Sequence, residues 1–70
     1  MPIVLAPVGQ KVRIVAMSLD EEVKKHLTDM GVAIGSEVEV VSNAGGSVVL
    51  DVLGARVALN REVAMKIRVA

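Results

Sequence analysis

Three side chains in the first half of the chain have the types and the spacing of a metal site. Glu22, His26 and Asp29 would lie within about 60° of one another on a helical wheel. A set of two carboxylates and one imidazole suits a divalent cation such as Fe²⁺ or Zn²⁺. One helix face rarely supplies a full coordination sphere, however, and a solvated polar face explains the same pattern. We therefore expect no cofactor, with a divalent metal at this trio as the alternative.

Other kinds of chemistry find less support in the sequence. The chain has no Cys and a single His, and no serine is spaced from a base and an orienting group as a nucleophile would be. Gly45 and Gly46 are followed by Ser47-Val48-Val49, without the lysine that a phosphate-binding loop needs. We expect that the protein is not an enzyme.

Composition argues against two classes of partner and for one compartment. The net charge is +0 and Phe, Tyr and Trp are absent, so the chain lacks the basic surface and the stacking rings that bind nucleic acid. No apolar run is long enough to span a bilayer and no signal peptide is visible, so we expect no direct membrane insertion. A small domain without cysteines fits a reducing compartment, which predicts a cytoplasmic protein.

The charges are unevenly distributed along the chain. Residues 1–16 carry +2, residues 17–51 carry −5 and residues 52–70 carry +3. The basic side chains of the last part are Arg56, Arg61, Lys66 and Arg68. They could orient an acidic partner during encounter, or they could simply be outward-facing residues of strands.

Most of the chain has the two-residue period of antiparallel strands. Nineteen of the 70 residues are Val or Ile, which favour a pleated sheet. The predicted strands are Lys11–Met17, Glu37–Val41, Ser47–Leu53, Arg56–Leu59 and Lys66–Val69. In the first strand, strict alternation places Val12, Ile14 and Ala16 inward and Met17 outward. Gly54 and Ala55 read as the two-residue loop of a type II′ hairpin.

One segment has the period of a helix instead. Apolar residues recur at Leu19, Val23, Leu27 and Met30, which predicts an amphipathic helix over about residues 19–30. Ser18 with Glu21 forms a capping box at its start, and Gly31 suits a left-handed residue at its end. Asn60 could cap a second, single helical turn near residues 61–65.

These elements predict a mainly β fold in one domain, residues 1–70. The economical arrangement is a small SH3-like antiparallel β-barrel, with the helix inserted after the first strand and the helical turn before the last.

The chain contains more aliphatic side chains than so small a barrel can bury. Contiguous exposed apolar surface usually marks an interaction site. We expect this site around the helix and the turn that follows it, at Met17, Leu27, Met30, Val32 and Ile34. The alternative is that Leu27 and Met30 belong wholly to the core. Spare apolar surface and unpaired strand edges would also permit a homodimer.

Three ordered segments resemble the FeoA family. They are Val8–Ile14, Leu27–Val38 with Met30-Gly31 followed by Gly35, and Val57–Val69 with its closing Ala64, Ile67 and Val69. The resemblance implies an SH3-like barrel and a role as a cytoplasmic accessory of bacterial ferrous iron uptake. It also implies docking on the cytosolic part of the membrane transporter FeoB. The same module occurs as the C-terminal domain of iron-dependent repressors, so a free-standing metal-sensing or regulatory module is the alternative function.

Overall fold

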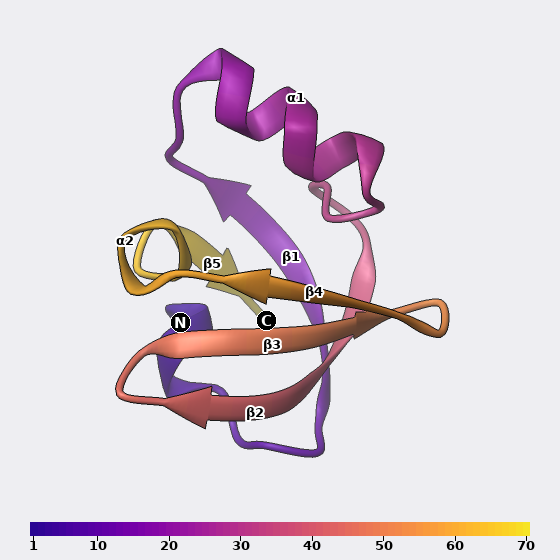
Figure 1. Cartoon of the computed structure of the whole chain (residues 1–70), viewed down its shortest axis with the longest axis vertical. Coiled ribbons are helices and arrows are strands. Elements are labelled where there is room, and N and C mark those ends of the chain that lie inside the picture. Colours follow the sequence, from indigo (N-terminus) through magenta and orange to yellow (C-terminus); the bar gives the residue numbers. More distant parts are fainter.

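A computed structural model describes all 70 residues and confirms the mainly β fold (Figure 1). The elements in chain order are η1 (Ile3–Leu5), β1 (Lys11–Met17), α1 (Glu21–Asp29), β2 (Glu37–Ala44), β3 (Ser47–Val52), β4 (Ala55–Leu59), α2 (Arg61–Ala64) and β5 (Ile67–Val69). Both expected helical segments are present, each slightly shorter than its sequence pattern.

The five strands form one antiparallel sheet with the order β4-β3-β2-β1-β5. The sheet bends around the core in the SH3-like manner, while α1 lies across one end (Figure 1). It does not close into the full barrel that we expected, because β4 and β5 stand at opposite ends of the strand order and do not pair.

The core follows the alternation of the sequence. It holds 17 buried side chains, all of them apolar, and no polar side chain is buried. Val12 and Ile14 of β1 and Val38 and Val40 of β2 point inward as predicted, and Glu37, the first residue of β2, is exposed. Burial of aliphatic surface is therefore the main stabilising term, because no buried polar network or disulfide is present.

Met17 does not lie on the outward face where strict alternation placed it. The register between β1 and β5 shifts between Ile14 and Ala16, which marks a β-bulge. A bulge inserts one extra residue and so reverses the faces of the residues that follow. Met17 is consequently buried, while Val15 remains exposed.

The ends of α1 are fixed by two local motifs. Asp20, not Ser18, is the N-cap, because its side chain accepts a hydrogen bond from the Val23 N–H at 3.0 Å. At the other end Gly31, with φ +91°, donates to the Thr28 carbonyl, and Val32 donates to the Leu27 carbonyl. This pair of bonds is a Schellman motif, which stops the helix and turns the chain back towards the sheet.

The β3–β4 hairpin has a different loop from the one that the sequence suggested. Val52 pairs with Ala55, so the two loop residues are Leu53 and Gly54. Both have positive φ, 53° and 89°, which is the pattern of a type I′ turn. The predicted type II′ turn with Gly54 as its first loop residue is therefore wrong, because the loop begins one residue earlier, with Leu53 at the positive φ that glycine more often adopts.

Candidate functional site

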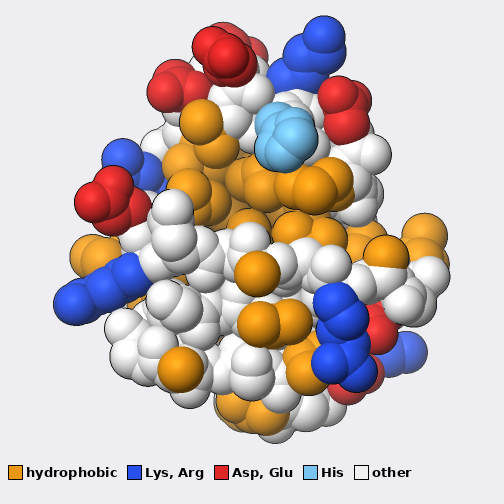
Figure 2. Space-filling view, in the orientation of Figure 1, with side chains coloured by type: hydrophobic (Ala, Val, Ile, Leu, Met, Phe, Trp, Pro, Cys, Tyr) orange, Lys and Arg blue, Asp and Glu red, His pale blue; other side chains and the backbone are white.

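An apolar groove separates α1 from β4. Hydrophobic side chains form a continuous band between these two elements, and the single histidine stands at its rim (Figure 2). We call it the α1–β4 groove; it has a volume of about 380 Å³. Its lining comprises Val23, His26, Leu27, Met30, Arg56, Val57, Ala58, Leu59, Asn60 and Val63.

Its two walls follow from the amphipathic pattern of each element. Val23 and Leu27 lie on the apolar stripe of α1, and Met30 continues that stripe at the C-cap with 38% of its surface exposed. On the opposite side Val57 and Leu59 are buried residues of β4. The helix therefore covers the end of the core only in part, and a strip of aliphatic surface stays open to a partner.

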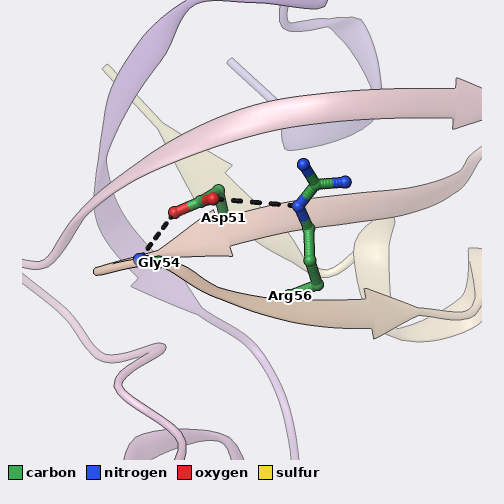
Figure 3. Close-up of polar contacts among 3 residues, drawn as sticks. All are labelled: Asp51, Gly54 and Arg56. Atoms are coloured by element: carbon green, nitrogen blue, oxygen red, sulfur yellow. Dashed lines mark hydrogen bonds and ion pairs between the residues drawn. The ribbon is translucent and has the colours of Figure 1, made fainter.

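The polar residues of the groove are His26, Arg56 and Asn60, and no carboxylate is among its lining residues. Arg56 Nε lies 3.8 Å from Asp51 Oδ2 (Figure 3), with 65% and 33% of the two side chains exposed. An ion pair this long and this exposed adds little stability and leaves most of the guanidinium donors free. The free donors of Arg56 therefore suit a negatively charged group of a ligand at the β4 side of the groove.

The five residues expected to bind a partner divide into two groups. Met17, Leu27 and Val32 are buried, with 6%, 5% and 0% of their surfaces exposed, so they support the surface from beneath. Met30 and Ile34 are exposed, and Met30 lines the α1–β4 groove whereas Ile34 does not. The alternative that Leu27 and Met30 belong wholly to the core does not hold for Met30, which is exposed, while Leu27 is buried and still lines the groove.

The candidate metal trio lies on the outer surface of α1. Glu22, His26 and Asp29 line one open hollow together with Asp20 and Lys25. No three carboxylate or imidazole groups lie close enough together to hold a metal ion. The three residues share one face of the helix as the helical wheel predicted. Glu22 and Asp29 are seven residues apart, however, which separates them by about 10 Å along the helix axis. The geometry therefore does not support the metal alternative.

The tip of the β3–β4 hairpin presents a second apolar feature. Leu53 is 99% exposed, and it is the only residue other than glycine with positive φ. Asp51 Oδ1 accepts a hydrogen bond of 2.9 Å from the Gly54 N–H, which holds the turn in place (Figure 3). Leu53 points into solvent and makes no contribution to the core.

Sequence reasoning missed the part that β4 plays in the groove. Residues 56–59 were read only as a returning strand, with basic side chains nearby. The order of the strands would have revealed the groove, because a strand at the end of a sheet has one edge without a neighbouring strand. The strand order depends on pairing between distant residues, and the alternation of residues within β4 carries no information about it.

Comparisons with known proteins agree with this fold. Residues 1–70 match the family described as FeoA domain. A protein of Methanocaldococcus jannaschii, provisionally named Fe(2+) transport protein A, is 32% identical over 68 residues, which are 97% of this chain and 83% of that protein.

Two solved structures are similar in fold. The FeoA protein of Chlorobium tepidum has a TM-score of 0.88 at 20% identity, covering 99% of this chain and 68% of that one. A manganese-dependent transcriptional repressor has a TM-score of 0.85 at 18% identity, covering 100% of this chain and 40% of that one.

Neither helix of the present chain has the length and apolar character needed to cross a bilayer.

Proposed function

Because the chain belongs to the FeoA domain family, we propose that it is a non-enzymatic accessory of ferrous iron uptake that binds the cytosolic part of a FeoB-type membrane transporter. The relative in M. jannaschii is named for Fe(2+) transport, which supports this assignment. The protein would work in the cytoplasm, by contact with the transporter and not by carrying the metal itself.

The observation that carries the proposal is the α1–β4 groove. It combines an aliphatic floor with a rim of His26, Arg56 and Asn60, which is the usual anatomy of a protein-binding site. The energy of binding would come from removing the open apolar strip from water. The charge of Arg56 at the rim would orient the partner as it approaches.

A regulatory module is the second candidate function. The fold similarity to a manganese-dependent transcriptional repressor favours it, since that protein carries the same module within a longer chain. The absence of a three-ligand cluster weighs against direct metal sensing by this chain. A regulatory role would therefore also depend on a protein partner in the groove.

Calorimetric titration against the isolated cytosolic domain of the FeoB-type transporter from the same genome tests the proposal. Wild-type chain should bind, and Met30→Asp should weaken binding about thirtyfold or more, because it places a charge in the desolvated centre of the contact. Met30 is exposed enough for the variant to fold.

Val8→Asp is the matched control, because Val8 is an exposed valine outside the groove. It should bind as the wild type does. Ile34→Asp shows whether the contact extends beyond the groove to the turn after α1. Equal binding by Met30→Asp and the wild type would contradict the proposed site, and no binding by the wild type would contradict the proposed function.

A further inference from the structure

The two outermost strands of the sheet differ in what covers them. The outer edge of β5 is occupied by the N-terminus: the Met1 amino group donates to the Val69 carbonyl at 2.8 Å, and the Val69 N–H donates to the Met1 carbonyl at 2.7 Å. Strand β4 pairs with β3 alone. Its other edge has no strand, helix or terminal segment bonded to it.

The main-chain groups on that open edge can be identified from the hairpin register. Val52 and Ala55 close a two-residue loop, so they form a hydrogen-bonded pair, and such pairs alternate along an antiparallel ladder. Val57 and Leu59 therefore bond towards β3, while the N–H and C=O groups of Arg56 and Ala58 point outward. No turn, cap or side-chain hydrogen bond uses the main chain of either residue.

The open edge and the α1–β4 groove are the same place. The groove is lined by five consecutive residues, 56–60. Successive side chains of a strand point to opposite faces, so a hollow that touches all of them must run along the backbone edge. Its other wall is the apolar stripe of α1, at Val23, Leu27 and Met30.

This combination specifies the chemistry of an occupant. Unpaired N–H and C=O groups in a row require main-chain partners, which an extended peptide supplies and a helix does not. The aliphatic walls require apolar side chains at alternate positions of that peptide. Arg56 is the one Lys or Arg of the lining, and its 3.8 Å contact with Asp51 leaves donors free, so it favours a peptide that carries an acidic residue at that end of β4.

We propose that an extended, mainly aliphatic segment of a partner protein, carrying an Asp or Glu, adds as a further strand to the edge of β4 beneath α1. This inference deepens the proposed function and rests on it for the identity of the partner protein. The mode of binding itself can be tested without that partner.

Ala58→Pro is the decisive variant. It removes the outward N–H of Ala58 and fills the edge with a ring, yet it breaks no bond to β3, and proline is tolerated on such edges. Ala58→Thr is the matched control, because it keeps the N–H and adds a side chain of similar size on the exposed face. Circular dichroism verifies that both variants fold.

The probe is a display library of random peptides about twelve residues long, more than twice the length of β4, selected on the immobilised chain. We expect enriched peptides with alternating Val, Ile or Leu and at least one acidic residue. Their affinity should fall about tenfold or more with Ala58→Pro, and by a clearly smaller factor with Ala58→Thr, which keeps the N–H and changes only a side chain of the groove lining. Two N-methylated versions of an enriched peptide extend this test, one methylated at the odd-numbered residues and one at the even-numbered residues. One version should lose binding, because its methyl groups replace the N–H groups that bond to β4, and the other should bind as the unmodified peptide does.

Three results would overturn the inference. The first is a library from which no peptide is enriched, and the second is enriched peptides that bind Ala58→Pro as tightly as the wild type. The third is a wild-type chain that dimerises and an Ala58→Pro chain that does not, because that result would assign the edge of β4 to a second copy of the chain. Transporter binding that survives Ala58→Pro would overturn the edge mode and leave the proposed function standing. Peptide binding without transporter binding would support the edge mode and contradict the proposed function.

Discussion

Replacing Gly31 with alanine should lower the free energy of unfolding by about 2–4 kcal/mol. Two costs add at this position. Gly31 has φ +91°, a conformation that alanine adopts only with strain. In addition, a Cβ atom there would lie 2.8 Å from Val52 Cγ1, so the buried Val52 side chain or the backbone on either side would have to shift. Urea denaturation followed by far-ultraviolet circular dichroism measures the loss.

Gly9→Ala separates the two costs. Gly9 has nearly the same φ, +89°, but no atom within 4 Å of the position that a Cβ would take. It should lose only the conformational part, about 1–2 kcal/mol. The cost of Gly31→Ala should be smaller when it is measured in a Val52→Ala background, because the double-mutant cycle isolates the contact between the two residues. Equal losses at Gly9 and Gly31 would show that the contact with Val52 has no influence.

Replacing Leu50 with alanine should cost about 3–5 kcal/mol, the range for a fully buried leucine. Leu50 lies in β3, is 0% exposed and pairs with Val40 on one side and Val57 on the other. A cavity there is shared by three strands and cannot be filled without moving the sheet. A domain of this size has about 3–5 kcal/mol in total, so the variant should be largely unfolded in thermal scans.

Leu53→Asn is the matched control for Leu50→Ala, because it alters a leucine that is 99% exposed in the next turn. Asparagine accepts positive φ more readily than leucine, so stability should stay the same or rise by about 1 kcal/mol. If Leu53→Asn were as damaging as Leu50→Ala, the hairpin tip would have to be part of the core.

The parts of the fold that depend on local pattern could be predicted from the sequence. The period of two in β1, β2 and β3 and the stripe of α1 gave the element types, and Gly31 and Asn60 gave a helix end and a helix start. These signals act over a few residues, where the dihedral preferences and capping bonds of the chain itself decide the outcome.

Features set by pairing between distant residues could not be predicted in the same way. Met17 faces the core because of a bulge in the β1–β5 register, which neither strand encodes alone. The groove exists because β4 ends the sheet while β5 is covered by Met1. Of the five predicted partner-binding residues, Met30 and Ile34 are exposed, whereas Met17, Leu27 and Val32 are buried.

The link between stability and function runs through the end of α1. Gly31 allows the helix to end against Val52, and the Schellman bonds fix where Met30 stands relative to the sheet. Packing at this glycine thus helps to fix how close the end of α1 lies to the sheet that carries β4. A Gly31→Ala chain that still folds should therefore bind partners more weakly than Gly9→Ala does.

Docking of a FeoB-type transporter on the α1–β4 groove can be tested most directly by nuclear magnetic resonance. The ¹⁵N-labelled chain is titrated with the unlabelled cytosolic domain of the transporter, and the amide chemical shifts are followed. We expect the largest changes at Val23, Met30 and residues 56–60. Changes confined to the hollow around Lys11, Glu37 and Glu39, or no change at saturating concentration, would contradict the claim.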